Sequence, residues 1–355
     1  MKGMMKAIVK TKAGKGAELR EVPIPEIGCD EMLVKVHAAS ICGSDLHIYH
    51  WDPWAANRMS PPVVIGHEFS GEVVEVGDEV ESFKIGDRVS SETHFVCGHC
   101  EQCRTHHANI CPNTVILGIN VNGAFAEYVK IPQKAAWKNT MDIDPAYLSI
   151  QEPLGNAVHT ILEGPTVGQT IAIVGCGPVG VLSIPVAKKA GAKKIYAIEP
   201  NEYRADLARK LGADVVINPF EVDPIEFIQK DTDGRGVDVV AEMSGNPIAL
   251  RQAVKYVKPG GQISLLGLAN SEITLDFAND VTFKGLILKG IAGRKMFDTW
   301  YTVRSLLESP DFNIKPAVTH RFRLEDFEEG FHLMESGNSG KIALYPDNVI
   351  FEKYK

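Results

Sequence analysis

The sequence predicts an α/β protein with two domains, one β-rich and one built on a doubly wound parallel sheet. The chain has 355 residues, which corresponds to two domains at about 150 residues each. The first 150 residues contain short runs rich in Val and Ile, separated by Gly, Pro and Asp, a pattern typical of antiparallel strands. After Gly164, strand-like runs alternate with helical ones, which indicates a parallel sheet covered by helices.

The expected elements follow the chain in order. In the β-rich part, strands are predicted at residues 6–10, 32–38, 72–76 and 88–90. In the second part, the predicted strands are residues 170–175, 194–199, 215–218, 237–243, 262–267 and 287–291. Helices are predicted at residues 179–190, 202–211, 225–230, 248–257, 299–308 and 324–336, with a last strand at 341–345. Pro185 removes one helical hydrogen bond, so we expect a kink or an irregular turn there.

Composition and charge exclude several classes of protein. Hydrophobic residues make up 45% of the chain and charged residues 23%, so a core can form and a mainly disordered chain is excluded. The net charge of −8 argues against a general nucleic-acid binder. The uncharged stretch 164–187 contains several Gly and Pro residues and is typical of a strand, a turn and a helix. We therefore expect no membrane span and, without a signal-like apolar segment, a cytoplasmic protein.

A glycine-rich corner predicts a dinucleotide site. Residues 170–180 read TIAIVGCGPVG, a buried strand that enters Gly175-x-Gly177-x-x-Gly180 at the start of a helix. These glycines allow a tight turn, approach to a pyrophosphate and close helix packing, respectively. Glu199 follows 19 residues after Gly180, where a carboxylate binds ribose hydroxyls and repels a 2′-phosphate, so NAD is favoured over NADP. The alternative is a corner that serves packing alone.

Four clustered cysteines predict a structural metal site. They have the spacing C-x2-C-x2-C-x7-C, and four thiolates can close a tetrahedral zinc shell; they are Cys97, Cys100, Cys103 and Cys111. An iron–sulfur cluster is the alternative, but its bacterial run ends in a shorter x3 gap. His99, His106 and His107 lie in the same loop and are predicted to be surface residues, because the cysteines already fill the shell.

A second set of possible ligands is dispersed. Cys42 lies in ICGSDLH, His67 and Glu68 lie in GHE, and Glu152 lies in QEPLG. Spacing alone does not bring them together. Taken singly, Cys42 is typical of a small buried residue and Gly-His-Glu of a turn.

Together these motifs resemble a known family along nearly the whole chain. The motifs CGSDLH (42–47), GHEFSGEV (66–73), GDRV (86–89), the cysteine lobe and GCGPVG (175–180) are similar to those of the medium-chain zinc-dependent alcohol dehydrogenases. The closest resemblance is to the branch that oxidises L-threonine. It rests on HIYHWDPWA (47–55), ETH (92–94), QEPLGNAVHT (151–160), EMSGNP (242–247), GIAGRKMFDTWY (290–301), THRF (319–322) and SGKIAL (339–344).

The resemblance assigns roles to these residues. It implies a catalytic zinc at Cys42, His67 and Glu68, with Glu152 as a carboxylate beside the metal and Ser44 and His47 as a proton relay. It also implies a structural zinc at the four cysteines. The implied NAD contacts are Gly175, Gly177, Val179, Gly180, Glu199, Arg204, Leu266, Gly267, Leu268, Ile291 and Ala292.

The resemblance also implies an architecture. A GroES-like catalytic domain would comprise residues 1–155 and 296–355, with the structural zinc lobe at about 95–113. A Rossmann NAD-binding domain would comprise residues 156–295. A homotetramer acting on a small molecule, away from nucleic acid and membrane, is expected.

The substrate depends on a smaller set of residues. Oxidation of the L-threonine 3-hydroxyl to L-2-amino-3-oxobutanoate requires recognition of a carboxylate and an ammonium, for which Arg294 and His94 are the candidates. A surface salt bridge and a loop histidine are the alternatives for these two residues. The threonine branch typically has Thr at position 44, whereas Ser44 is also found in polyol and butanediol dehydrogenases. The alternatives are therefore a vicinal-diol or polyol dehydrogenase and, more remotely, a non-catalytic nucleotide-binding protein.

Overall fold

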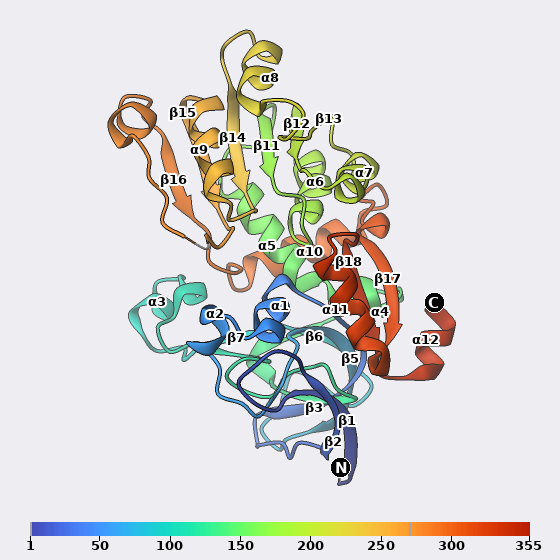
Figure 1. The fold of residues 1–355 in the computed structure, drawn as a ribbon. Coiled ribbons are helices and arrows are strands. Elements are labelled where there is room, and N and C mark those ends of the chain that lie inside the picture. The colour runs from blue at the N-terminus through green and yellow to red at the C-terminus, as the bar shows by residue number, and fades with distance from the viewer. Residues whose placement is uncertain (1, 270) are drawn as a thin grey trace. The chain divides into compact units, whose positions relative to one another are not determined.

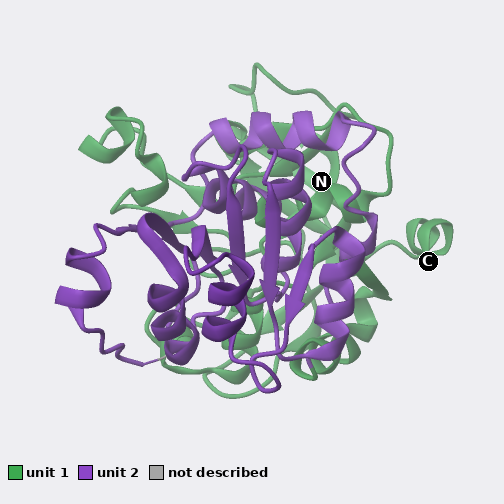
Figure 2. Ribbon diagram, turned by 90° about the horizontal axis from the view of Figure 1, so that it is seen from above, with its two compact units in different colours: residues 1–153, 318–336, 341–355 green, residues 154–317, 337–340 purple. Residues whose placement is uncertain are grey.

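The structure is a computed structural model that describes residues 2–269 and 271–355. It divides into two compact units (Figure 2). Unit 1 comprises residues 1–153, 318–336 and 341–355, and unit 2 comprises residues 154–317 and 337–340. Unit 1 is therefore discontinuous in the sequence.

One boundary differs from the expectation. Residues 296–317, predicted as part of the catalytic domain, belong to unit 2, and the chain returns to unit 1 at Val318. Contacts within unit 2 explain the difference. Lys189 Nζ forms an ion pair with Asp311 Oδ1 at 2.6 Å, and the short helix η4 (Lys315–Ala317) packs on helix α7.

Unit 1 is β-rich (Figure 1). Its described residues form a seven-stranded sheet with the order β10-β6-β5-β3-β18-β17, in which β9 also pairs with β3, a three-stranded sheet β2-β1-β4 and a pair β7-β8. The strands are β1 (Met4–Lys10), β2 (Glu18–Pro23), β3 (Glu31–Ser40), β4 (Val63–Val64), β5 (Glu68–Val76), β6 (Arg88–Ser91), β7 (His94–Phe95), β8 (Val115–Ile116), β9 (Tyr128–Pro132), β10 (Ala136–Lys138), β17 (Val318–Arg323) and β18 (Lys341–Tyr345). The helices are α1 (Gly43–His50), α2 (Pro53–Ala56), α3 (Glu101–Arg104), α4 (Pro145–Ser149), α11 (Phe327–Glu335) and α12 (Asn348–Tyr354).

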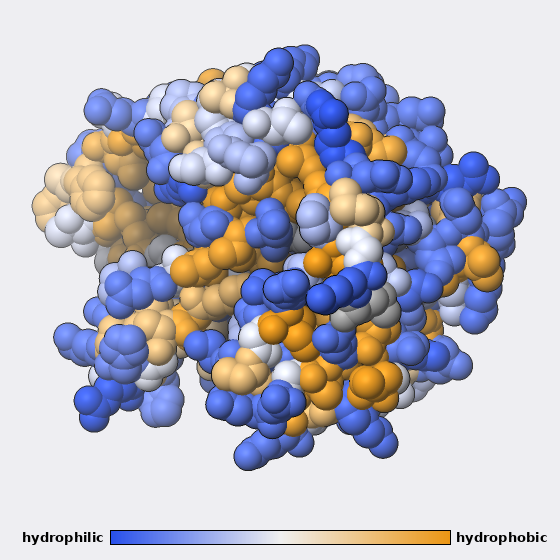
Figure 3. Space-filling model, turned by 90° about the horizontal axis from the view of Figure 1, so that it is seen from below, coloured by the Kyte–Doolittle hydropathy of each residue, from blue (hydrophilic) through white to orange (hydrophobic). Residues whose placement is uncertain are grey.

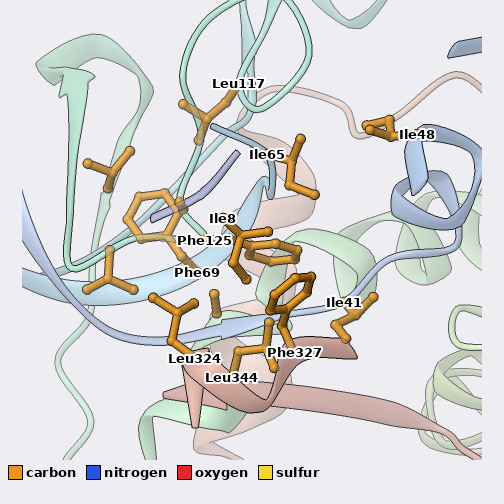
Figure 4. Close-up of a cluster of buried hydrophobic side chains, with 14 of the residues drawn as sticks. Ile8, Ile41, Ile48, Ile65, Phe69, Leu117, Phe125, Leu324, Phe327 and Leu344 are labelled. Carbon is orange, nitrogen blue, oxygen red and sulfur yellow. The ribbon is translucent and has the colours of Figure 1, made fainter. Parts of the chain in front are cut away.

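The core of unit 1 joins distant parts of the chain. Ile8, Phe69 and Phe125 from the N-terminal segment pack with Phe327 and Leu344 from the C-terminal segment (Figure 4). Strand β18 also pairs antiparallel with β3. The C-terminal residues are therefore an integral part of this unit.

Unit 2 contains the predicted parallel sheet. Its described strands have the order β13-β12-β11-β14-β15-β16, and all five pairings are parallel, so the first strand in the sequence lies inside the sheet. This order is that of a doubly wound dinucleotide-binding fold, which confirms the predicted fold class. The strands are β11 (Thr170–Val174), β12 (Lys194–Ile198), β13 (Val215–Ile217), β14 (Val237–Glu242), β15 (Val257–Leu265) and β16 (Ile287–Gly290). The helices are α6 (Gly180–Lys189), α7 (Glu202–Leu211), α8 (Pro224–Asp231), α9 (Pro247–Tyr256) and α10 (Asp298–Glu308).

Two local expectations need correction or addition. Helix α6 continues through Pro185, so the expected irregular turn is absent, and a kink there stays a prediction. Residues 180–187 are all buried, and we attribute the continuity to packing that holds the helix despite the missing hydrogen bond. Helix α5 (Gln151–Leu162) had no prediction, because Pro153 and Gly155 are unfavourable inside helices.

Among the described residues, no helix combines the length and apolarity that crossing a bilayer requires. The space-filling view shows hydrophobic side chains interspersed with hydrophilic ones on one face (Figure 3).

A tight turn at Gly66 precedes the predicted ligands of the second motif. Gly66 has φ +89°, and a Cβ there would lie 2.1 Å from Cδ1 of Phe125. Gly118 and Gly123 are equally restricted, since a Cβ on either would lie within 2.4 Å of the Gly66 carbonyl oxygen. Position 66 therefore requires glycine for two reasons. Its φ is positive, and any side chain there would overlap Phe125.

Replacement of Gly66 by Ala tests this packing, with Gly86→Ala as a matched control. Gly86 has nearly the same φ, +90°, but nothing lies within 4 Å of a Cβ there. Both variants should lose about 1–2 kcal/mol of unfolding free energy because of the positive φ. Gly66→Ala should lose about 1–3 kcal/mol more, because its new methyl group overlaps Phe125. Chemical denaturation measures both. Equal losses in the two variants would contradict the account.

Candidate active site

The structure brings the three dispersed ligand candidates together within unit 1. One ligand atom from each of Cys42, His67 and Glu68 lies within 4.8 Å of the others. The sheet explains this arrangement. Ser40 at the end of β3 pairs with Glu68 at the start of β5, so the residues just outside both strand ends become neighbours.

The start of helix α1 fixes Cys42. Cys42 is the N-cap residue, and its N–H donates a hydrogen bond of 2.9 Å to Oδ2 of Asp45. Asp45 is completely buried, and this burial raises the pKa of its carboxyl to about 6. Its other oxygen lies 3.7 Å from Nδ1 of His67, so one carboxylate contacts both ligand candidates.

The electrostatics of the cluster favour a cation. Burial alone would lower the pKa of His67, but the negative charges of Asp45 and Cys42, with a smaller effect of Glu152, raise it to about 10. A buried site that stabilises a positive charge so strongly suits a divalent metal ion.

The donor set fits zinc. A thiolate, an imidazole and a carboxylate are zinc ligands, and three protein ligands leave a fourth position for substrate. Oε1 of Glu68 is buried, and among the described residues no hydrogen-bond partner is found for it. This oxygen is therefore the one that can bind a metal.

The other oxygen of Glu68 is held by the protein. Oε2 accepts hydrogen bonds from Ser40 Oγ and from Nζ of Lys341. Lys341 also donates to the carbonyl oxygen of Ile41 at 2.9 Å, and the side chains of Glu68 and Lys341 are both 0% exposed. Lys341 lies in the SGKIAL motif, but its position gave no signal of a contact with a residue 273 positions away.

Glu152 lies close to this cluster but outside the three-residue set. It is in the first turn of α5, is only 5% exposed, and its Oε1 accepts a hydrogen bond from Thr93 Oγ1 at 3.3 Å. Its role as a carboxylate beside the metal stays a prediction.

The predicted relay residues lie on helix α1. Ser44 and His47 are three residues apart and therefore share a face of the helix. Ser44 is half-buried and His47 is exposed, so the two side chains extend from the interior toward solvent. Nδ1 of His47 lies 2.5 Å from Oδ2 of Asp52, and its ring is 5.5 Å from that of Trp54. The bond from His47 helps to keep the pKa of Asp52 below its usual value, although burial opposes this effect.

The four cysteines form a second cluster in unit 1. Their sulfur atoms lie within 4.8 Å of one another, with Sγ–Sγ distances of 4.0 Å for Cys97–Cys103, 3.8 Å for Cys100–Cys111 and 3.6 Å for Cys111–Cys97. A tetrahedron with Zn–S bonds of about 2.3 Å has edges of about 3.8 Å. Hydrogen bonds from the backbone of His99 and Cys100 lower the pKa of Cys97 to about 5, whereas burial raises the pKa of Cys103 to about 12, because four adjacent thiols do not all ionise together without a cation. The cluster fits a structural zinc ion.

The glycine corner in unit 2 has the geometry that a dinucleotide requires. Gly175 has φ +84°, and a Cβ there would lie 2.7 Å from Ser244. A Cβ on Gly180 would lie 2.0 Å from the Gly175 carbonyl oxygen, whereas nothing lies within 4 Å of one on Gly177. The first and third glycines therefore serve the turn and the packing, and the second leaves space for a pyrophosphate.

The remaining candidate cofactor residues also lie in unit 2. Glu199 follows β12 and accepts hydrogen bonds from the N–H groups of Cys176 at 2.7 Å and Asn201 at 2.9 Å. The others lie at the start of α6, in α7, after β15 and after β16; they are Val179, Arg204, Leu266, Gly267, Leu268, Ile291 and Ala292.

The two candidate substrate residues belong to different units. His94 is half-buried in unit 1, and its N–H donates to Oε1 of Glu92 at 3.0 Å. Arg294 is 1% exposed in unit 2, and its Nη1 donates to Oδ1 of Asn156 at 3.1 Å. A surface salt bridge is therefore not the environment of Arg294. The substrate roles of both residues remain predictions.

Two family models match the chain. Residues 28–141 match the alcohol dehydrogenase GroES-like domain, and residues 178–309 match the zinc-binding dehydrogenase model. The chain belongs to the zinc-dependent alcohol dehydrogenase family.

Relatives of this dehydrogenase cover nearly its full length. It is 52% identical over 347 residues to the L-threonine 3-dehydrogenase of Caldanaerobacter subterraneus, covering 98% of this chain and 100% of the relative. It is 54% identical to that of Symbiobacterium thermophilum, covering 97% and 98%. Among solved structures, the 2R,3R-butanediol dehydrogenase of Bacillus subtilis has a TM-score of 0.88 and 32% identity, covering 97% of this chain and 100% of that one.

Two serine substitutions separate the roles of the metal clusters in this dehydrogenase. Cys42→Ser should reduce zinc from about two to about one ion per chain and abolish dehydrogenase activity, with little change in thermal stability. Cys100→Ser should also remove one zinc ion, but it should lower the melting temperature because the lobe loses its cross-link. Elemental analysis and thermal unfolding measure these effects. Loss of both ions in Cys42→Ser, or of neither, would contradict the assignment.

Proposed function

We propose that the chain oxidises the 3-hydroxyl of L-threonine to L-2-amino-3-oxobutanoate and transfers the hydride to NAD. The observation that carries the proposal is 50–54% identity, over nearly the whole chain, to curated proteins named L-threonine 3-dehydrogenase. The assembled Cys42, His67 and Glu68 cluster supports catalysis and argues against a non-catalytic nucleotide-binding protein.

The residues of unit 1 provide the acid–base part of the reaction. When bound, zinc supplies a Lewis acid that lowers the pKa of a substrate hydroxyl, and NAD supplies the hydride acceptor. Ser44 accepts the hydroxyl proton and passes it outward to His47. His47 exchanges the proton with solvent, and Asp52 holds its imidazole in place.

The cofactor preference depends on Glu199. Its carboxylate is 4% exposed and already accepts two backbone hydrogen bonds, one of them from Cys176 in the glycine corner. A ribose with free hydroxyls can donate to this carboxylate, whereas a 2′-phosphate would be repelled by it. We therefore expect NAD rather than NADP.

A homotetramer in the reducing cytoplasm is also proposed. None of the seven cysteines, all within the described residues, forms a disulfide, which agrees with a reducing compartment. Strand β16 forms one edge of its sheet, and nearby side chains such as Phe283 and Ile287 are exposed, which supports association through this edge. Light scattering of the purified protein tests the oligomeric state.

A direct assay tests the substrate. NADH formation at 340 nm should be much faster with L-threonine than with 2,3-butanediol or sorbitol at equal concentrations, and NADP should replace NAD poorly. The diol is the serious alternative, since the butanediol dehydrogenase of Bacillus subtilis has the same fold and 32% identity. A preference for the diol would reject L-threonine as substrate and retain the zinc and relay assignments.

Replacement of Asp52 by Asn tests the relay. Asn can still cap helix α2, as Asp52 does through Ala55 N–H, but it removes the charge that holds His47. We expect kcat for L-threonine to fall about threefold to tenfold with zinc content unchanged. The matched control is Glu335→Gln. It removes the carboxylate that lies 2.6 Å from Nε2 of His50, the other histidine at the end of helix α1. An unchanged kcat in Asp52→Asn would exclude a role in proton transfer.

A further inference from the structure

One face of helix α5 contacts a segment of unit 2 that carries several candidate binding residues. Residues 155, 156 and 159 lie within the motif QEPLGNAVHT, and the spacing of 155, 159 and 163 places them on a single helix face. Glu163 follows the last helical residue, but its N–H still donates to the His159 carbonyl oxygen at 3.1 Å. Each of these residues contacts the segment 289–295, which is called the α5-bound segment below.

The first contact is with Arg294. A Cβ on Gly155 would lie 2.8 Å from Cγ and 2.9 Å from Cδ of Arg294, so glycine allows the arginine stem to lie directly on the helix. The next residue, Asn156, accepts a hydrogen bond from the guanidinium through Oδ1 at 3.1 Å. Helix α5 therefore fixes both the stem and the head of Arg294.

The second contact is with the backbone. Nδ1 of His159 lies 2.8 Å from the carbonyl oxygen of Gly293, which has φ +54°. Burial lowers the pKa of His159 despite the nearby carboxylate of Glu163, so at neutral pH the ring carries a single proton and donates it to this carbonyl. The bond fixes a turn that lies directly between Ala292 and Arg294.

The third contact holds both ends of the α5-bound segment. Glu163 forms ion pairs with Lys289 in β16 and with Lys295, the latter at 2.5 Å. Burial would raise the pKa of Glu163, but the two lysines outweigh it and keep the carboxyl ionised. The side chain of Glu163 is 8% exposed, so these pairs are better shielded from solvent than ordinary surface pairs.

We propose that Gly155, Asn156, His159 and Glu163 are positioning residues that hold the α5-bound segment in its binding conformation. The inference rests on the proposed function, because Ile291 and Ala292 are candidate cofactor contacts and Arg294 is a candidate for the substrate carboxylate. The helix then sets the affinity for NADH through the backbone at 291–292 and the affinity for the substrate through Arg294. None of the four residues needs to touch a reacting atom.

Variants of His159 test the proposal in the full-length, zinc-loaded enzyme. His159→Leu removes the donor to Gly293, whereas His159→Asn retains an amide N–H near the position of Nδ1. Glu163→Gln removes the charge between the two lysines. Asp311→Asn is the matched control, since it breaks an exposed ion pair with Lys189 elsewhere in unit 2. The readouts are hydrogen exchange of peptides covering 289–295, NADH affinity by fluorescence, and KM and kcat for L-threonine.

We expect His159→Leu to speed exchange in the α5-bound segment and to weaken NADH binding, each by about fivefold to tenfold, which corresponds to one lost hydrogen bond. KM should rise more than kcat falls, His159→Asn should remain within about twofold of the parent, and Glu163→Gln should act like His159→Leu. Unchanged exchange and NADH affinity in both His159→Leu and Glu163→Gln would overturn the proposal, as would equal effects in Asp311→Asn. Exchange and NADH binding do not depend on the substrate, so a parent enzyme that fails to oxidise L-threonine rejects the proposed function and leaves this test valid.

Discussion

The two oxygens of the buried Glu68 carboxylate have different partners, and the arrangement of unit 1 depends on this difference. One oxygen contacts the interior of unit 1, and the other faces the candidate metal site. Oε2 is bound by Lys341 and Ser40 in the interior, and Oε1 remains for the metal. A buried carboxylate that loses its charged partner costs about 3–5 kcal/mol. Lys341 therefore sets the orientation of Glu68 as well as its charge balance.

This ion pair joins the N-terminal and C-terminal parts of the discontinuous unit 1. Strand β3 lies between β5 and β18, so Ser40 pairs with Glu68 on one side and with Ala343 on the other. The candidate metal ligands come from the N-terminal segment, but the lysine that orients one of them comes from the C-terminal segment. The chain must pass through unit 2 and return before the site is complete.

The determinants of the predicted dinucleotide site are local, which is why the sequence alone points to it. The glycine corner follows β11 and Glu199 follows the adjacent β12, and parallel pairing of Val174 with Ile198 brings both to one edge of the sheet. The four cysteines were predictable for the same reason, since they lie within 15 residues of sequence. The contacts of Lys341 and His159, and the contact of Asp45 with His67, were not predictable, because each depends on tertiary packing that no spacing rule encodes. The boundary at Val318 was missed because residues 296–317 are held to unit 2 by tertiary contacts.

Diffraction at the zinc absorption edge, from crystals of the full-length protein, tests the central claim most directly. The account predicts two anomalous peaks per chain. One should be bound by the four cysteine sulfurs, and the other by Cys42, His67 and Oε1 of Glu68, with Oε2 still paired to Lys341. A single peak in the cysteine lobe, or a second zinc ion with Glu68 turned away from it toward Lys341, would contradict the account.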